Sequence, residues 1–392
     1  MNALDEAKVI YEQLVTWRRD FHRHPEVGLT LPRSARIVAE TLQKLGYTVS
    51  SGLAESGVVG LLENGAGPVV MVRADMDALP IQEENDVPYA SEIPGKMHAC
   101  GHDAHMAIGL GVAQLMAETR DHWQGTLKLV FQPGEEGDNG AEIMVQEGVL
   151  ENPRPDSVLA LHVWNEGRVG SVAVAPGPVM AAAEAWEAKI QGKGGHAAVP
   201  EEAVDPIVTA ALTITALQTI VSRNVGAEDA AVVTVGKLRA GDTFNVIPDV
   251  AQLEGTVRTF EPEVRETVLR RLREIVEGTA ETMGAEATLR LHALTPAVVN
   301  DEAVTAVVQD AVRTLLGEEG LDVELRTMGS EDAAFFLQEV PGCYFFVGAT
   351  SPDAESHIPH HNPYFDIDEA VLPIGVAVLV EALRRLLPVE ET

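Results

Sequence analysis

Val69-Val-Met-Val-Arg73 is a short, mainly apolar run rich in β-branched residues, and it lies between Gly67-Pro68 and Asp75. Such a run predicts a buried strand. Around it, amphipathic patterns predict helices at 4–23, 32–45 and 103–117, and apolar runs predict strands at 127–131 and 157–161. Strands that alternate with helices indicate an α/β fold with a mostly parallel sheet and helices on both faces.

A different pattern begins after residue 180. Segments 184–191, 231–237 and 252–258 alternate apolar and polar residues, as strands with one solvated face do, and helices are expected at 205–223 and 262–283. We therefore expect an inserted α+β domain over 181–294, with an antiparallel sheet and two helices. Beyond it the α/β pattern returns, with helices at 302–316, 331–339 and 369–387 and a strand at 343–347. Residues 1–180 and 295–392 are then one discontinuous domain.

The charge of the chain limits its partners. Its 392 residues include 60 Asp and Glu against 28 Lys and Arg, which gives a formal net charge of −32. Such a surface repels phosphate groups and anionic lipids, so we expect no nucleic-acid partner and no membrane partner. Solubility is the simplest role of this charge, and adaptation to high salt is the alternative.

Two cysteines, Cys100 and Cys343, are too few for a disulfide scaffold. A free thiol or a metal ligand is the expectation for a chain of this kind, and Cys343 lies in an apolar strand pattern that favours a core residue. The N-terminal residues carry charges throughout, unlike a secretory signal, and 206–222 falls short of the ~20 apolar residues that a membrane span needs. We expect a cytoplasmic protein.

Chemically reactive side chains gather at the ends of the predicted strands. In an open α/β sheet the carboxyl ends of the strands meet at one crevice, where ligands bind. A thiol, imidazoles and carboxylates at one crevice predict a metal site of the Zn, Mn or Co kind. The residues concerned are Asp75, Asp77, Cys100, His102, Glu135, Glu136, His162, His360 and His361.

Two spacings within this set carry chemical meaning. Cys100 and His102 are two apart in an expected extended turn, so their side chains would point to the same side. Glu135 and Glu136 are adjacent and must point differently, so that one can bind metal while the other acts as a general base. These residues also have plainer interpretations. Cys100 can be a small core residue, His162 a structural histidine, and the two glutamates part of an ordinary acidic loop.

A series of motifs along the whole chain resembles the M20 metallopeptidase superfamily, in its branch of hippurate hydrolases, N-acyl-amino-acid amidohydrolases and auxin-conjugate hydrolases. The motifs occur in the order that the family has. They are Arg19-Asp-Phe-His-Arg-His-Pro-Glu26, Arg73-Ala-Asp-Met-Asp-Ala-Leu-Pro80, Met97-His-Ala-Cys-Gly-His-Asp-Ala-His105, Pro133-Gly-Glu-Glu-Gly137, Ala160-Leu-His-Val-Trp164, Gly192-Lys-Gly-Gly-His-Ala-Ala198, Phe244-Asn-Val-Ile-Pro-Asp249, Gly255-Thr-Val-Arg-Thr-Phe260, Gly329-Ser-Glu-Asp332 and His361-Asn-Pro363.

The resemblance implies a metal-dependent amidohydrolase that cleaves N-acyl-L-amino acids. It implies two divalent metal ions per subunit (Zn, Mn, Co or Ni), with Glu135 as general base and Asp77 as an orienting residue that does not bind metal. The implied ligands are Cys100, His102, Glu136, His162 and His361. A dipeptidase or aminoacylase of the same superfamily is the alternative, and the acyl group and the amino acid stay open.

The resemblance also gives the insert a function, as a lid or dimerisation domain of a homodimer or a higher homo-oligomer. It implies that His196 stabilises the oxyanion in the partner subunit's site and that Asn245 and Arg258 hold the carboxylate of a small-molecule substrate. A turn residue and a solvated strand end are the alternatives for Asn245 and Arg258. The roles of Asp75, His105 and His360 stay open, with the following Asn-Pro favouring His361 over His360 as ligand.

Overall fold

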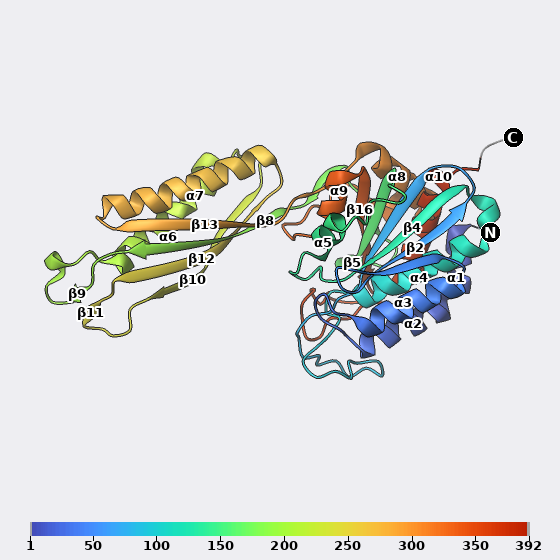
Figure 1. Cartoon of the computed structure of the whole chain (residues 1–392), viewed down its shortest axis with the longest axis horizontal. Coiled ribbons are helices and arrows are strands. Elements are labelled where there is room, and N and C mark those ends of the chain that lie inside the picture. Colours follow the sequence, from blue (N-terminus) through green and yellow to red (C-terminus); the bar gives the residue numbers. More distant parts are fainter. Residues whose placement is uncertain (1, 390–392) are drawn as a thin grey trace. The chain divides into compact units, whose positions relative to one another are not determined.

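The computed structural model describes residues 2–389 and divides the chain into two compact units (Figure 1). Unit 1 comprises the described residues up to Val179, Val299–Leu325 and the described residues from Asp332 onward. Unit 2 comprises Met180–Val298 and the short segment Arg326–Glu331, which the sequence-based division into 181–294 does not contain.

The centre of unit 1 is an eight-stranded sheet in the order β1-β2-β4-β3-β5-β16-β6-β15. Its four central strands are parallel, and antiparallel pairs occur only toward the edges, which confirms the mostly parallel α/β fold. The strands are β1 (Thr48–Leu53), β2 (Gly57–Asn64), β3 (Val69–Asp75), β4 (Gly125–Gln132), β5 (Ser157–Arg168), β6 (Val172–Ala173), β15 (Leu321–Asp322) and β16 (Gly342–Thr350).

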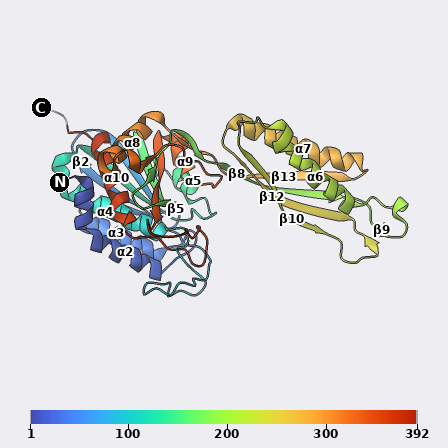
Figure 2. The same cartoon turned by 180° about the vertical axis from the view of Figure 1, so that it is seen from behind.

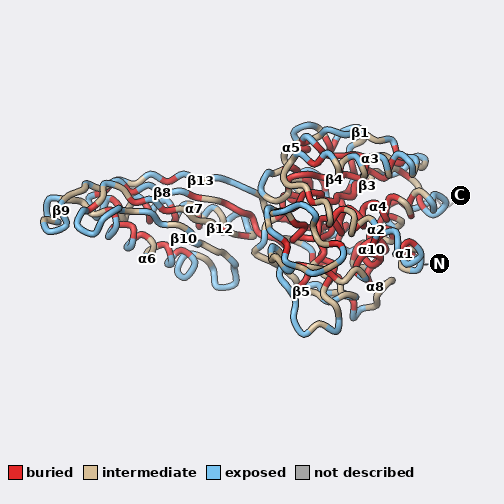
Figure 3. Tube along the Cα trace, turned by 90° about the horizontal axis from the view of Figure 1, so that it is seen from below, coloured by how far each residue is buried: buried red, intermediate tan, exposed pale blue. Residues whose placement is uncertain are grey.

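Helices cover this sheet. Every residue of β3 from Val70 to Asp75 is buried, whichever face it points to, so both faces of the sheet are covered at its centre (Figure 3). Among the helices, α4 (His102–Glu118) contacts β3, β4 and β5, and α10 (Val371–Leu386) contacts β5 and β16. The others are α1 (Ala3–Val9), α2 (Tyr11–Arg23), α3 (Pro32–Lys44), α5 (Gly140–Gln146), α8 (Glu302–Leu316) and α9 (Ala334–Glu339).

Three elements of unit 1 differ from the sequence-based expectation. The single helix expected at 4–23 is two helices, because Ile10 leaves helical geometry at φ −95° and ψ 9° and caps both of them. The helix expected at 331–339 begins only at Ala334. The antiparallel pair of β1 and β2 was not predicted.

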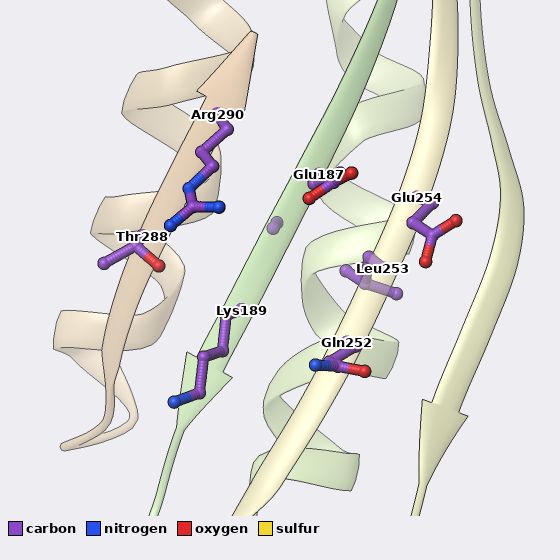
Figure 4. Close-up of a pocket in the computed structure, with 8 residues that line it drawn as sticks. Glu187, Lys189, Gln252, Leu253, Glu254, Thr288 and Arg290 are labelled. Atoms are coloured by element: carbon purple, nitrogen blue, oxygen red, sulfur yellow. The ribbon is translucent and has the colours of Figure 1, made fainter.

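Unit 2 is built on an antiparallel sheet in the order β10-β12-β8-β13, with two helices on one face (Figure 2). Apolar side chains between sheet and helices form its core, with Trp186 fully buried. The opposite face carries exposed charged side chains such as Glu187, Lys189 and Arg290 (Figure 4). The elements are β8 (Ala182–Gln191), α6 (Pro206–Asn224), β10 (Ala231–Ala240), β12 (Val250–Thr259), α7 (Pro262–Thr282) and β13 (Glu286–Thr295).

Helix α6 contains the apolar segment noted at 206–222. By length and composition alone it is long and apolar enough to cross a membrane, because the helix continues to Asn224. It packs on the sheet of unit 2 through one face, where Ala210, Leu217 and Ile220 are fully buried. The apolar character of α6 therefore belongs in part to the core of unit 2.

Candidate metal centre

The register of the central strands brings the reactive groups of unit 1 to one level. Arg73 of β3 pairs with Ala160 of β5, and Asp75 pairs with Gln132 of β4, so Asp75, His162 and the segment after Gln132 lie side by side. His162 does not end its strand as expected, because β5 continues to Arg168. It reaches the site because its neighbour β3 ends at Asp75. The residues of β5 that follow Ala160 therefore have no partner in β3.

Cys100 and His102 converge through a different backbone geometry from the one predicted. The turn is not extended: Gly101 has φ +91°, and His102 is the first residue of α4. A Cβ on Gly101 would lie 2.4 Å from Cγ2 of Val163, in addition to the strain of a left-handed backbone. Glycine is therefore required here for the cysteine and the helix to approach β5.

The hydrogen bonds of His162 and His102 direct one ring nitrogen of each into the site. Nδ1 of His162 lies 2.6 Å from the carbonyl oxygen of Val163, and Nδ1 of His102 lies 2.8 Å from that of Asp77. Because a carbonyl only accepts, both Nδ1 atoms carry the proton and donate it. The Nε2 atoms are left for the site, where Nε2 of His162 lies 3.4 Å from Sγ of Cys100 and Nε2 of His102 is buried without a hydrogen bond.

Asp77 holds the two glutamates. Its Oδ1 and Oδ2 accept hydrogen bonds of 3.0 Å from the backbone N–H groups of Glu135 and Glu136. Glu136 turns toward His361, with Oε1 3.2 Å from Nε2, and lies 3.9 Å from Nε2 of His102. The carboxylate of Asp77 is thus engaged by the backbone, which is the arrangement expected of an orienting residue.

The structure separates His361 from His360. His361 adopts φ +62° and donates its backbone N–H to the carbonyl of Ala99, next to Cys100. A left-handed backbone conformation is unfavourable for a residue other than glycine, and where it occurs it tends to mark a functional site. His360 instead stacks on Trp164 and accepts a hydrogen bond from the backbone N–H of Asn165. His361 alone of this pair therefore belongs to a set of donors that can share an ion.

Asn165 ties the segment that carries both histidines to β5. Its side-chain amide donates hydrogen bonds of 2.9 Å to the carbonyls of Ile358 and Asp366. This role was not predicted, since a lone asparagine in a strand carries no sequence signal.

Donor atoms of the predicted ligands and of Glu135 form overlapping sets that could each hold an ion. The sets are Cys100 with His102 and His162, Cys100 with Glu136 and His361, and His102 with Glu135 and Glu136. Sulfur, imidazole nitrogen and carboxylate oxygen together suit Zn²⁺ and similar ions.

The electrostatics of these donors fit a cation. Burial lowers the pKa of His102, but Asp75, Asp77 and Glu136 outweigh it and raise the pKa to about 10. Burial, followed by Glu136 and Glu135, raises the pKa of the Cys100 thiol well above its usual value. The buried carboxylates thus favour positive charge at the orphaned His102 Nε2, and a divalent ion would displace the protons of both groups.

A buried polar network lies behind the predicted ligands, and sequence reasoning missed it. Arg73 donates to Gln132 Oε1 at 2.7 Å, to Asp75 Oδ2 at 2.7 Å and to Asp332 Oδ1 at 3.1 Å. Burial raises the pKa of Asp75, but Arg73 and the neighbouring histidines hold it well below its usual range. An arginine inside an otherwise apolar strand pattern was the available signal.

The remaining predicted residues lie in unit 2. His196 is in β9 (Gly195–His196), which pairs with β11 (Val246–Ile247), and Ala197 donates its N–H to the carbonyl of Asn245 at 3.1 Å. His196 and Asn245 line one hollow, which lies beyond the end of the sheet where β8 ends at Gln191. Arg258 pairs with Ala183 at the other end. Eight residues along β12 separate the two ends, a span of roughly 26 Å.

Comparison with known proteins places this centre in a family context. The model of peptidase family M20/M25/M40 matches residues 71–385. The chain is similar to IAA-amino acid hydrolase ILR1-like 4 of Arabidopsis thaliana, with 38% identity covering 96% of this chain and 86% of that protein. It is also similar to N-acetyl-L-cysteine deacetylase of Bacillus subtilis, with 39% identity covering 97% of this chain and 89% of that protein. Among solved structures, the YXEP protein of Bacillus subtilis, described as a dinuclear metal binding peptidase, superposes with a TM-score of 0.85 and 32% identity over 97% of this chain and 99% of that one.

Proposed function

The chain belongs to peptidase family M20/M25/M40 and is a hydrolase that acts on amides, and we propose that its substrates are N-acyl-L-amino acids. The observation that carries this proposal is the agreement of the two similar hydrolases. Their names give different groups on the amine, IAA in one and acetyl in the other, but in both the amine part is an amino acid. The products would be a carboxylate and a free amino acid.

Two divalent metal ions fit the donor set, and the dinuclear relative supports this number. Cys100, His102, Glu136, His162 and His361 would hold them. Such ions polarise an amide carbonyl and lower the pKa of water. Cys, His and Glu together accept Zn, Mn, Co or Ni.

Glu135 is the proposed general base. Its backbone N–H donates to the carboxylate of Asp77. One oxygen of its own carboxylate lies within 4.8 Å of donor atoms of His102 and Glu136. From there Glu135 would take the proton of the attacking water and return it to the leaving amine, because the amine leaves only when it is protonated. Loss of such a base lowers the rate by ~10²–10⁴.

His196 is proposed to donate a hydrogen bond to the developing oxyanion. Its Nδ1 accepts the N–H of Ala198 at 3.0 Å, so the neutral ring carries its proton on Nε2 and presents it as a donor. Asn245 accepts from the hydroxyl of Thr243 through Oδ1, which leaves its amide N–H groups for a substrate carboxylate.

The separation of these residues from Arg258 supports a homodimer. His196 and Asn245 lie beyond the end of β12 that is roughly 26 Å from Arg258, and a small N-acyl amino acid cannot span that distance. If His196 and Arg258 both contact the substrate, they must come from different subunits. We propose that Arg258 holds the substrate carboxylate in its own subunit and that His196 and Asn245 complete the site of the partner.

One side of unit 2 suits the dimer contact. The edge strand β10 lies beside α6, whose exposed face carries Ile207, Val208 and Leu212. The other edge, β13, lies beside α7, whose exposed face carries ion pairs such as Arg273 with Glu277. Apolar residues favour burial in an interface, so we assign the contact to α6 and β10. Leu212→Glu should yield monomers in light scattering after gel filtration, whereas Arg273→Glu on α7 should stay dimeric.

The function is tested with hippurate, N-acetyl amino acids and dipeptides, each with defined Zn²⁺, Mn²⁺ or Co²⁺. Hydrolysis of the N-acyl compounds with little action on dipeptides supports the proposal, and the reverse preference assigns the chain to the dipeptidases. Glu135→Gln should bind the metal ions and lose at least about 10²-fold in turnover. Near-normal turnover of this variant would refute the mechanism.

Subunit mixing tests the role of His196. Glu135→Ala and His196→Ala proteins should each have little activity alone, but a mixed dimer has one site with both residues intact. Random exchange makes half of the dimers mixed, with one working site of two, so activity should return to roughly a quarter of wild type. Exchange without recovered activity would show that His196 acts only within its own subunit or not at all.

A further inference from the structure

The histidine that follows His102 by one helical turn has no assigned role, although it is part of the same buried cluster. His105 is 2% exposed and stacks on His102, with ring centroids 5.4 Å apart. Its ring also meets that of His162 edge-on at 4.6 Å. Its geometry would allow it to be a ligand together with Asp75 and His102.

Both nitrogens of His105 are already used. Nε2 accepts a hydrogen bond of 2.9 Å from the backbone N–H of Val163. An acceptor nitrogen has no proton, so the neutral ring carries its proton on Nδ1, which lies 2.5 Å from Oδ1 of Asp75. His105 therefore offers no lone pair to an ion, and Asp75 has one oxygen on His105 and the other on Arg73.

The backbone of Val163 joins this pair to a proposed ligand. Its N–H binds His105, and the carbonyl of the same residue accepts the Nδ1 proton of His162 at 2.6 Å. The position of the Val163 residue thus sets both the direction of the His162 ring and the tautomer that leaves Nε2 free. At the other end of these contacts, Asp75 binds Arg73, and Arg73 also donates hydrogen bonds to Gln132 and Asp332.

We propose that the buried pair of His105 and Asp75 positions the ligand His162 through the backbone of Val163, with Arg73 as the anchor of the pair. His105 and Asp75 are positioning residues and not ligands. This inference rests on the proposed role of His162 as a metal ligand, and it adds the reason why His162 presents Nε2 with a fixed ring orientation. Loss of groups that orient metal-bound histidines typically lowers metal affinity 10–100-fold.

Two substitutions of His105 separate positioning from packing. His105→Gln keeps an oxygen near the place of Nε2 that can accept from Val163 N–H, whereas His105→Phe keeps the ring shape and accepts nothing. Lys128→Met is the matched control. Lys128 is equally buried and donates to the carbonyls of Glu151 and Pro153, but none of its partners is a proposed ligand.

The measurement is a titration of the metal-free protein with Co²⁺, read by the visible absorption of the bound ion. Wild type should bind two Co²⁺ ions per subunit. His105→Phe should bind one of them 10–100-fold more weakly with a changed spectrum. His105→Gln should stay within about threefold of wild type, and Lys128→Met should bind as wild type does despite a lower Tm.

Equal Co²⁺ affinity and spectra for wild type and folded His105→Phe would overturn the inference and leave the proposed function intact. No Co²⁺ binding by wild type would overturn both. If His105→Phe does not fold, the tautomer decides: in ¹⁵N-histidine-labelled protein the His105 signals, identified by their absence in His105→Gln, must show Nδ1 protonated. A proton on Nε2 would refute the proposal, because that nitrogen could then not accept from Val163.

Discussion

Arg18 should be among the most costly residues to replace in unit 1, because three carboxylates contact its guanidinium and one of them is fully buried. Its side chain is fully buried and lies 2.9 Å from Asp103, 2.7 Å from Asp366 and 3.3 Å from Glu369. Arg18→Met keeps much of the volume but leaves the carboxylate of the fully buried Asp103 without its guanidinium partner, next to the His22 ring that is 2.7 Å away. Breaking a buried ion pair by removing one partner costs about 3–5 kcal/mol, because the other charge stays buried and uncompensated.

The assay is calorimetric unfolding of the metal-free protein. A loss of about 3–5 kcal/mol lowers Tm on the order of 10 °C for a unit of this size. Arg36→Met is the matched control: Arg36 also lies on a helix and pairs with Glu40 at 3.2 Å, but both side chains are about half exposed. Exposed pairs of this kind contribute ~0.3–0.5 kcal/mol.

A double-mutant cycle isolates the cause. Asp103→Leu added to Arg18→Met removes the stranded charge, so the double variant should be more stable than the sum of the two single changes by at least about 1 kcal/mol. The reasoning fails if Arg18→Met unfolds within about 1 °C of Arg36→Met, or if the two single changes are additive.

Three other changes have outcomes set by single contacts. Gly101→Ala should cost about 2–4 kcal/mol, because it combines a left-handed backbone at φ +91° with a Cβ 2.4 Å from Val163, and the purified protein should carry less metal by elemental analysis. Burial lowers the pKa of His22, but Asp103 and Glu83 outweigh it, so the folded-state pKa lies above the unfolded value of about 6.5. The stabilisation that protonated His22 gives the folded state is then complete below about pH 6.5 and is lost as pH rises through the folded-state pKa. The stability of His22→Gln should therefore differ most from that of wild type in acid, and a difference that does not change with pH would contradict this. Adding Zn²⁺ to the metal-free protein should raise Tm, by the equivalent of ~2.7 kcal/mol at one hundred times Kd, and an unchanged Tm would count against a site at the orphaned His102 Nε2.

The architecture was predictable because its signals are periodic and local. The apolar run at 69–73 is a strand whose two faces are buried, and the alternation at 184–191 is a strand with one open face. The meeting of Glu136 and His361 was predictable from strand ends alone, since the segments that leave parallel strands emerge at one edge of the sheet. One error lies at Ile10, because a helix pattern does not record a break of a single residue.

The approach of Cys100 to His102 was expected for the wrong reason. An extended turn would place both side chains on one side by alternation, whereas the structure does so with a left-handed Gly101 that starts a helix. Both geometries are compatible with Cys-Gly-His, and the left-handed one brings Gly101 so close to Val163 on β5 that a Cβ would not fit. A choice made by a tertiary contact is not present in the local sequence.

The roles of Asp75 and His105 show the same limit at the level of single atoms. By residue type both are good metal ligands, and by position both lie in the right cluster. Their use is decided by the Val163 N–H, which occupies the lone pair of His105 and fixes the proton on the side of Asp75. A backbone amide is identical in every residue except proline, so no sequence pattern can mark it. Whether a buried histidine binds an ion or orients another histidine therefore depends on which backbone groups face its two nitrogens, and that depends on strand register.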